Sequence, residues 1–382
     1  MPAAPVIVTK KQLVNAFSLC LQAQVPVLLV GRPGEGKTSI AKAIAKKLAW
    51  PIHVLPVPGK REPAQVIGLP QRLENVSRWV PYEWILALKE APHSIVFLDD
   101  LAEASRDMQA FFLELVYGRR FGDVVLENAS MAAAANPDEG HLDLTPALAN
   151  RLVHLQWKIS AIEFATDFAA DFPEPEVPIL DPSWIEHRGI WRQTVAEFLR
   201  TIPDLRQPDP TMTELLREEA GPFPSQRTWD FGATLLAASG SLGLSELEQQ
   251  QLQVLLLQST VGVATANSFF AWRAGKGLPR PEELLERPAR IKDAAFKNRP
   301  DTTWIAVLSV LRHTLFNLAE PTVWDSAWRF LDYLAETGQV QFGVNAARIL
   351  YQRRPAARKG KDPAETRHYS RMLEALTKKP RG

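Results

Sequence analysis

The chain has little of several features that would assign it to particular classes of protein. Its 382 residues include one cysteine, Cys20, so no disulfide can form within the chain. Cys20 shares one side of a predicted helix with Leu13, Val14, Phe17 and Leu21, which favours a place in the core over a reactive thiol. No apolar run approaches the roughly 18 residues that span a bilayer, and the first residues carry no signal sequence. We therefore expect a cytoplasmic protein without a membrane segment.

The chain also has almost no net charge. Forty-four basic residues balance 43 acidic ones, which leaves a formal charge of +1 and no global field for nucleic acid or an acidic membrane. The last 30 residues, from Arg353, are an exception, with ten Lys or Arg against three acids. This composition favours a solvated tail or surface helix over a nucleic-acid contact. The rest is of ordinary globular composition, 46% hydrophobic and 23% charged, and long enough for two or three domains.

The strongest motif runs from Gly31 to Thr38, Gly-Arg-Pro-Gly-Glu-Gly-Lys-Thr, and fits the G-x-x-x-x-G-K-[ST] pattern of a phosphate-binding loop. The apolar run 25–30 before it has the length of a buried strand. Apolar residues of 39–48 recur at helical spacing after it. Backbone N–H groups of the loop and of the helix N-terminus can then point at phosphates, Lys37 can neutralise them, and Thr38 can bind Mg²⁺. The predicted nucleotide-binding residues are Gly31, Arg32, Pro33, Gly34, Glu35, Gly36, Lys37, Thr38 and Ser39.

Two carboxylates follow a second buried strand. The apolar run from Ser94 ends in Asp99 and Asp100. Because an open parallel sheet binds its ligand at the carboxyl ends of its strands, we expect both side chains to face the phosphates. Asp99 suits the Mg²⁺ shell and Asp100 suits the orientation of the attacking water; the alternative is two solvated acids at a strand end.

Other local patterns indicate an α/β domain. We expect helices at 9–22, 84–88, 105–117 and 146–150, strands at 52–57 and 152–157, and a hairpin at 118–126. Gly68, Pro70 and Pro81 make 64–82 irregular, which indicates an insertion. The run 131–135 is rich in alanine, which favours helix, so periodicity alone does not predict a strand there.

The second half of the chain is predicted to be helical. Prolines crowd between about 171 and 212, a connector with a helix near 191–199. Further helices are expected at 225–238, 244–258, 303–318, 322–336 and 343–352. Seven of the eleven tryptophans follow residue 180, and at helical spacing they favour packing over ligand binding. The predicted domains are a nucleotide-binding domain (1–165), the connector (166–212), a helical lid (213–275) and a helical extension with a basic tail (276–382).

The order of these signals resembles the MoxR-like branch of the AAA+ ATPases over residues 5–240. The resemblance is carried by Val96-Phe-Leu-Asp-Asp100, Arg119-Arg-Phe-Gly122, Ala133-Ala-Ala-Asn136-Pro and Pro146-Ala-Leu-Ala-Asn-Arg151-Leu-Val-His-Leu-Gln-Trp157. It implies a P-loop domain with a parallel sheet, followed by an all-α lid, that uses ATP and Mg²⁺. Lys37 and Thr38 would belong to Walker A, Asp99 and Asp100 to Walker B, and Asn136 would be the sensor 1 residue that positions water.

The resemblance also implies roles for residues outside the loop. Arg151 would be the arginine finger that reaches the γ-phosphate of the neighbouring subunit, and Arg227, in Pro224-Ser-Gln-Arg-Thr-Trp229, the sensor 2 arginine of the lid. Ile67–Tyr82 would be the helix-2 insert and Gly118–Asn128 the hairpin before sensor 1. For Arg119 and Arg120, a second nucleotide or pore contact competes with a solvated position.

One departure from the family stands at Asp100, where members usually carry Glu. The shorter side chain withdraws the carboxylate by about 1.5 Å, a misplacement that can cost on the order of a hundredfold in rate. We therefore expect slow hydrolysis with binding preserved.

The resemblance implies an ATPase that assembles into a homo-oligomeric ring, expected to be a hexamer, and remodels or assembles another protein, commonly a partner with a von Willebrand factor A domain. Two alternatives stay open. One is a nucleotide-controlled binding switch with negligible turnover, motivated by Asp100, and the other is a DNA-linked AAA+ motor that uses the basic tail. A guanine-specific site would need an Asn-Lys-x-Asp motif, which the chain lacks.

Overall fold

The structure is a computed structural model that describes residues 8–73, 76–137, 142–207, 221–274, 279–293, 296, 300–317, 320–355 and 369. The chain divides into two compact units, one formed by Ala4–Ala266 and the other by Asn267–Gly382 with Met1–Ala3. The predicted α/β domain, connector and most of the lid fall in the first unit. The boundaries at 165, 212 and 275 stay predictions.

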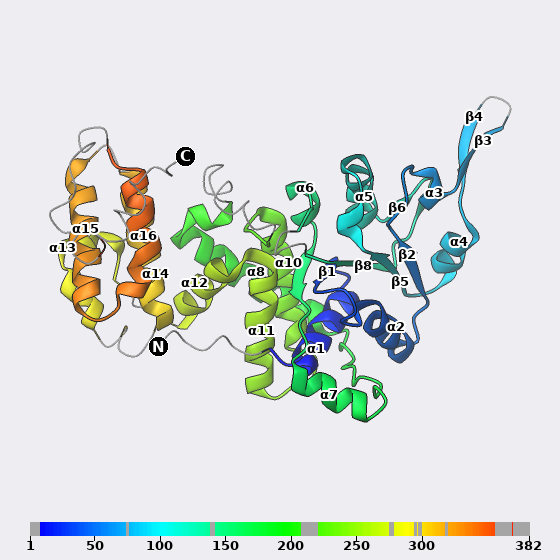
Figure 1. The fold of residues 1–382 in the computed structure, drawn as a ribbon, viewed down its shortest axis with the longest axis horizontal. Helices are drawn as coiled ribbons and strands as arrows, with labels where there is room; N and C mark the ends of the chain where they lie inside the picture. Colours follow the sequence, from blue (N-terminus) through cyan, green and yellow to red (C-terminus); the bar gives the residue numbers. More distant parts are fainter. Residues whose placement is uncertain are drawn as a thin grey trace, which may run out of the picture. The chain divides into compact units, whose positions relative to one another are not determined.

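A five-stranded parallel sheet forms the centre of the first unit, with the strand order β2-β5-β8-β1-β9 (Figure 1). Its strands are β1 (Val27–Val30), β2 (Ile52–Pro56), β5 (Ser94–Asp99), β8 (Ala129–Ala135) and β9 (Val153–Gln156). β1 lies between β8 and β9, with Val27 beside Ala132 and Val153. All of its residues and all those of β8 are buried, as expected for parallel strands covered on both faces. The predicted fold class, an α/β P-loop domain followed by helices, is confirmed.

The assignment of β8 corrects the sequence prediction. Alanine propensity favours helix over 131–135, yet the run pairs with β1 on one side and β5 on the other. Alternate residues enter different cores: Ala132 and Ala134 pack on one face of the sheet, and Met131 and Ala133 on the other. Because every side chain of β8 is buried between two strands and two helical layers, burial and pairing override local propensity.

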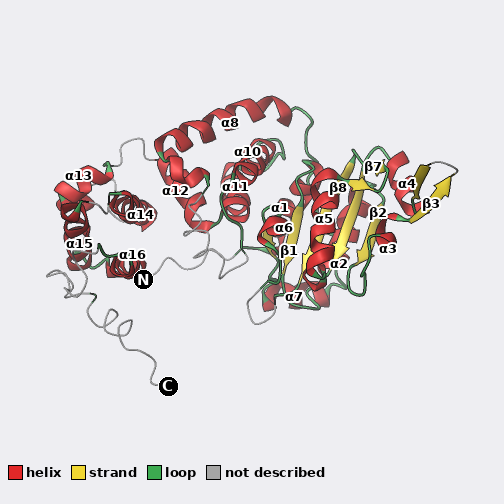
Figure 2. Cartoon of the chain, turned by 90° about the horizontal axis from the view of Figure 1, so that it is seen from above, coloured by secondary structure: helices red, strands yellow, loops and turns green. Residues whose placement is uncertain are grey.

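Helices cover both faces of the sheet (Figure 2). One face is covered by α1 (Lys10–Gln22) and α2 (Lys37–Leu48), together with α10 (Gln226–Ser239) and α11 (Glu246–Val261). The other is covered by α3 (Ala64–Ile67), α4 (Glu83–Glu90), α5 (Arg106–Gly118), α6 (Pro146–Ala149) and the 3₁₀ turn Leu101–Glu103. Thr9 begins α1 with a capping box to Gln12, and Ser225 begins α10 in the same way with Thr228.

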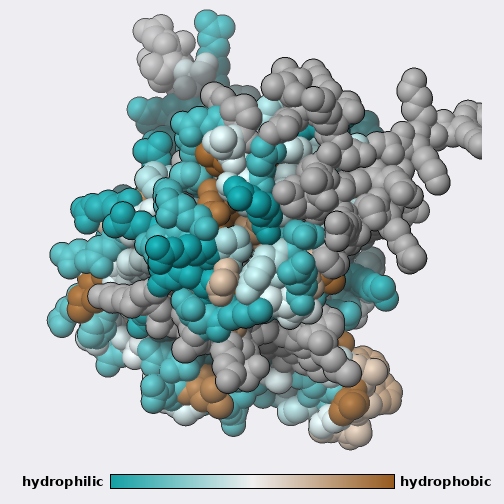
Figure 3. All heavy atoms as spheres, turned by 90° about the vertical axis from the view of Figure 1, so that its left-hand side faces the viewer, coloured by the Kyte–Doolittle hydropathy of each residue, from teal (hydrophilic) through white to brown (hydrophobic). Residues whose placement is uncertain are grey.

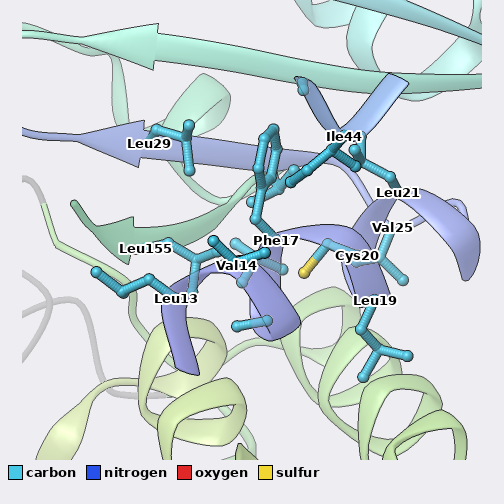
Figure 4. Packing of buried hydrophobic residues seen from close by; sticks show 14 of the residues in the cluster. Leu13, Val14, Phe17, Leu19, Cys20, Leu21, Val25, Leu29, Ile44 and Leu155 are labelled. Carbon is cyan, nitrogen blue, oxygen red and sulfur yellow. The ribbon is translucent and has the colours of Figure 1, made fainter. Parts of the chain in front are cut away.

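Helix α1 is the centre of the first core. In Figure 4, Phe17 and Cys20 of α1 lie among Leu29 of β1, Leu155 of β9 and Ile44 of α2. These side chains are at most a few per cent exposed, and burial raises the pKa of the Cys20 thiol far above its ordinary value. The predicted place of Cys20 in the core is confirmed.

Two hairpins extend from the other face. β3 (Leu69–Leu73) pairs with β4 (Val76–Val80) in the region predicted to be an insertion, and β6 (Arg120–Phe121) pairs with β7 (Val124–Val125) at the predicted hairpin. The first projects away from the sheet in Figure 1. The backbone N–H of Trp79 donates to Asp123 at 3.1 Å, and the Trp79 ring lies against Gly122, so each hairpin supports the other.

The region predicted to be a connector is more ordered than its prolines suggest. It contains α8 (Trp184–Thr201), longer than the predicted helix 191–199, and the 3₁₀ turn Pro203–Arg206. Arg188 and Arg192 of α8 pair with Asp230 of α10, and the Phe198 and Trp229 rings contact each other. α8 therefore packs as part of the helical layer.

Helix α7 (Ala161–Ala169) was absent from the sequence prediction. Its acids face the sheet domain, where Glu163 accepts from the backbone of Lys10 at 2.7 Å and Asp167 pairs with the Lys10 ammonium. Its apolar side chains face outward, and Figure 3 shows apolar atoms gathered at the lower right, where α7 lies. The exposed hydrophobic residues on and just after α7 are Ile162, Phe164, Phe168 and Phe172.

The second unit has a helical core of its own. It contains α13 (Pro281–Glu286), α14 (Pro300–Phe316), α15 (Pro321–Glu336), α16 (Val340–Gln352) and the 3₁₀ turn Pro288–Lys292, and α12 (Val263–Ala274) runs through the boundary between the units. Trp324 and Trp328 are buried in this core, which confirms the expected packing role for these two tryptophans. Beyond residue 355 the basic tail lies outside the described residues, apart from Tyr369. Among the described residues, no helix has the length and apolarity to cross a membrane.

Candidate nucleotide-binding site

The predicted phosphate loop joins the end of β1 to the start of α2. Gly34 and Gly36 adopt φ of +83° and +76°, which side chains rarely tolerate, and a Cβ on either would meet nothing within 4 Å. The loop backbone is therefore open to a ligand. α2 begins at Lys37, and its N-cap Gly36 offers no side-chain hydrogen bond, so the N–H groups of the first turn have no cap. This arrangement fits the binding of an anionic phosphate.

Lys37 is held from three sides at the base of the loop. Its Nζ donates to the carbonyl oxygens of Gly31 at 2.7 Å and Arg32 at 2.8 Å, and to Oδ1 of Asn136 at 2.7 Å. The residue is 6% exposed, and this burial lowers the pKa of the ammonium, while the charges of Glu35, Asp100 and Asp99 oppose the shift. The loop, β8 and the acids after β5 therefore converge on one cation.

Thr38 and Asp99 lie together as a possible pair of Mg²⁺ ligands. The Thr38 hydroxyl donates to Oδ2 of Asp99 at 2.8 Å. A hydroxyl and a carboxylate oxygen beside an open phosphate loop are the hard donors that Mg²⁺ prefers, so the residues fit the ion. Thr38 and Asp99 are far apart in the sequence, and the structure brings them together as the sequence predicts.

Asp100 and Asn136 form the next contact along the edge of the sheet. Asn136 Nδ2 donates to Oδ1 of Asp100 at 2.7 Å, while its Oδ1 accepts from Lys37. Asp100 has a φ of +57°, in the left-handed region that few residues with side chains adopt. This conformation turns the chain away from β5 directly after the strand and leaves the Asp100 carboxylate within reach of Asn136.

The sequence prediction did not give a role in the site to Trp157, the residue after β9. A Cβ on Gly31 would lie 2.3 Å from the Trp157 carbonyl oxygen, so only glycine fits there. The Trp157 indole donates to the Glu35 carbonyl at 3.0 Å, and the Glu35 carboxylate accepts from the Arg32 backbone at 2.9 Å. These contacts shape the loop from its β9 side. The strand beside β1 is expected to end near the loop, but the sequence does not show that β9 is that strand.

The two predicted catalytic arginines do not join this cluster. Arg151 precedes β9, and Val153 at the start of β9 lies beside Val27 at the start of β1. From that level to Gly31 the strand rises by about 13 Å, so Arg151 lies beyond the opposite edge of the sheet. An arginine side chain extends roughly 7 Å from its Cα and cannot span this distance.

Arg227 lies beside Arg151 and not beside the phosphate loop of its own chain. Its guanidinium donates to Asn150 Oδ1 at 3.4 Å, and that oxygen also accepts from the Ser225 hydroxyl at 2.8 Å. The ring of Tyr117, in the last turn of α5, lies 5.0 Å from the Arg227 guanidinium carbon and 6.0 Å from that of Arg151. We refer to Arg151 and Arg227 as the arginine pair.

The Arg119 side chain holds the end of α5 against neighbouring segments. Its guanidinium donates to the Gln24 carbonyl at 3.0 Å, the Gln24 side chain at 3.1 Å and the Glu127 carbonyl at 2.8 Å, and burial lowers its pKa. These contacts tie the end of α5 to Gln24, just after α1, and engage both terminal nitrogens of the guanidinium within the chain. Arg120 lies at the surface, 3.8 Å from Glu114.

Comparison with known proteins supports the α/β assignment. Residues 26–152 match the family described as AAA domain (dynein-related subfamily). A comparison with curated protein sequences finds no match. A solved structure from Cytophaga hutchinsonii, provisionally described as an ATPase, is 15% identical and covers 67% of this chain and 83% of its own, with a TM-score of 0.41. A similarity of that size does not indicate a shared function. The fold of residues 26–152 is thus that of a AAA-type P-loop domain, and the family match supports nucleotide binding and ATP hydrolysis at the level of the family.

Proposed function

We propose that the chain is an ATPase whose site is completed by a second copy, in a ring that remodels or assembles a partner protein. The position of Arg151 supports this proposal most. Arg151 lies beyond the edge of the sheet opposite the phosphate loop, so it can reach a bound triphosphate only on another subunit. AAA domains generally act as rings, which would bring one subunit's far edge to the next subunit's loop.

Within one subunit, each polar residue of the loop cluster would have a separate task. Lys37 would bind the β- and γ-phosphates, releasing its bonds to Gly31, Arg32 and Asn136 in part. Thr38 and Asp99 would hold Mg²⁺, which supplies charge neutralisation on the phosphates when bound. Asp100 and Asn136 would orient the attacking water. The backbone of the loop, Gly31 to Gly36, and the Ser39 N–H would hold the phosphate oxygens.

Between subunits, the arginine pair would stabilise charge that develops on the transferred phosphoryl group. Arg227 was expected to act from the lid, as sensor 2. Its bond to Asn150, the residue before Arg151, supports a role together with Arg151 on the neighbouring nucleotide. Six subunits and a partner with a von Willebrand factor A domain are the ring size and client that the resemblance to MoxR-like proteins suggests.

The test is ATP turnover against protein concentration, for wild type and Arg151→Ala. We expect turnover per subunit to rise with concentration in the wild type, and Arg151→Ala to stay low at all concentrations. Turnover that is independent of concentration and unaffected by the substitution would refute the ring proposal. Arg200→Ala, at the exposed end of α8, is the matched control.

A nucleotide-controlled binding switch is the second candidate, favoured by the contact between Asp100 and Asn136. The short carboxylate of Asp100 is already bonded to the Asn136 amide at 2.7 Å, which leaves it less available to orient water. A switch would bind ATP tightly, lose that binding in Lys37→Ala and release little phosphate. Brisk phosphate release by the wild type would exclude this candidate.

A further inference from the structure

One aromatic ring contacts both members of the arginine pair. Tyr117 is 57% exposed, and its ring lies 5.0 Å from the Arg227 guanidinium carbon and 6.0 Å from that of Arg151. An aromatic face is negative and attracts cations within about 6 Å. Two cations on one ring repel each other, so the ring offsets part of the cost of bringing them together.

The charges around Arg151 show this repulsion. Burial lowers the pKa of the Arg151 guanidinium, and the positive charge of Arg227 lowers it further. The Arg151 side chain makes one hydrogen bond among the described residues, from a terminal nitrogen to the Ala147 carbonyl at 2.8 Å, and its buried Nε has no partner there. A buried donor without a partner is costly, and the remaining protons on the terminal nitrogens can donate to an anionic oxygen.

Tyr117 lies in the last turn of α5, whose end is held by Arg119. Arg119 ends the helix with a φ of +52°, and its guanidinium bonds to Gln24 and Glu127 hold that end against the core. The arginine pair arrives from two other elements, Arg151 after α6 and Arg227 in the first turn of α10. The ring and the two guanidinium groups therefore come from three separate elements that meet at one point.

We propose that Tyr117 is a positioning residue, whose ring holds Arg151 and Arg227 side by side so that both reach the same phosphate group of a neighbouring subunit's nucleotide. The proposal rests on the proposed function, since it requires that the arginine pair acts between subunits. It assigns the hydroxyl no part, because the contact uses the face of the ring.

The experiment measures kcat, the ATP concentration at half-maximal turnover, and nucleotide affinity in assembled full-length protein. Tyr117→Leu removes the ring and Tyr117→Phe keeps it. We expect Tyr117→Leu to lower kcat about fivefold to thirtyfold, the range for the loss of two partly exposed cation–π contacts, with nucleotide affinity unchanged. Tyr117→Phe restores most of the turnover. Phe164→Leu, which removes an exposed ring of α7, is the control for loss of surface aromatic area and keeps wild-type turnover.

A double variant separates positioning from a general effect on the fold. If Tyr117 acts through the arginines, Tyr117→Leu has no further effect on kcat in an Arg151→Ala, Arg227→Ala background. A further loss there, an equal loss in Tyr117→Phe, or wild-type kcat in Tyr117→Leu would overturn the proposal. If Arg151→Ala and Arg227→Ala themselves turn over like wild type, the proposed function fails and positioning fails with it. Low turnover in those two variants with full turnover in Tyr117→Leu refutes positioning alone.

Discussion

Lys37 and Arg151 are cations of the same domain in opposite situations. All three protons of the Lys37 ammonium have acceptors within the chain, at 2.7 to 2.8 Å. Arg151 has one such acceptor, a cationic neighbour, and a buried Nε that no described residue satisfies. The loop cluster is thus a complete hydrogen-bonded network in one chain, whereas the arginine pair is electrostatically incomplete. The difference supports the proposal that the arginine pair meets an anion brought by another molecule.

The largest expected effect is the loss of ATP turnover when the arginine pair is changed. Arg151→Ala should lower ATP turnover on the order of a thousandfold, the usual scale for an arginine supplied between subunits. Nucleotide affinity of the dilute chain should be unchanged, because Arg151 lies at the far edge of the sheet. Steady-state phosphate release and equilibrium binding of a fluorescent nucleotide check the two parts. A parallel loss of affinity would mean that Arg151 contributes to its own subunit's site.

A change in the loop cluster should instead reduce nucleotide affinity. Lys37→Ala should weaken nucleotide binding by about a hundredfold, since it removes charge-assisted hydrogen bonds to phosphate. Lys42→Ala, on the exposed side of α2, is the matched control and should bind as the wild type does. Isothermal titration with ATP and with a non-hydrolysable analogue measures both. Equal affinities of the two variants would contradict the assignment of the loop.

A smaller effect is expected at Asp100. Asp100→Glu extends the carboxylate by about 1.5 Å, towards the position of the Glu that MoxR-like proteins usually carry, and should raise turnover about tenfold. Asp107→Glu, exposed on α5, gives the control. Phosphate release at saturating ATP is the measurement. Unchanged or reduced turnover would show that the left-handed backbone at Asp100 already places the shorter carboxylate correctly.

The smallest expected effect is on the pH dependence of stability, through His154 of β9. His154 on β9 is buried, with Nε2 at 2.9 Å from the Ala149 carbonyl, and burial lowers its pKa from 6.5. Below about pH 6.5 the unfolded chain binds a proton that the folded chain excludes, so the stability from this group is present above that pH and declines as pH falls. The slope of unfolding free energy against pH between about 6.5 and 5 should decrease by up to about 1.4 kcal/mol per unit in His154→Gln.

Urea unfolding across that pH range measures the slope for wild type, His154→Gln and the exposed His187→Gln. The control should keep the wild-type slope. An unchanged slope in His154→Gln would mean that the buried ring is already protonated in the folded state.

The sequence predicted the parts of the site that local motifs determine. Lys37, Thr38, Asp99, Asp100 and Asn136 each stand at a strand end or loop, and parallel pairing brings such ends to one edge. Their contacts in the structure agree with that reasoning, while their catalytic roles stay predictions.

What the sequence could not supply depends on tertiary contacts. Alanine propensity gave the wrong state for β8, because pairing on both sides and burial decide that element. Trp157 reaches the loop only because β9 is the neighbour of β1. Tyr117 and Arg227 are 110 residues apart, so no local pattern could place them together at Arg151.

Mixing two inactive variants tests the central claim most directly. Lys37→Ala cannot hold the triphosphate but keeps the arginine pair, and Arg151→Ala binds nucleotide but lacks the donated arginine. If one subunit completes the site of the next, each variant alone has low turnover and the mixture turns over ATP well above the sum of the two. A mixture that stays at the sum, with wild-type protein active under the same conditions, would contradict the account.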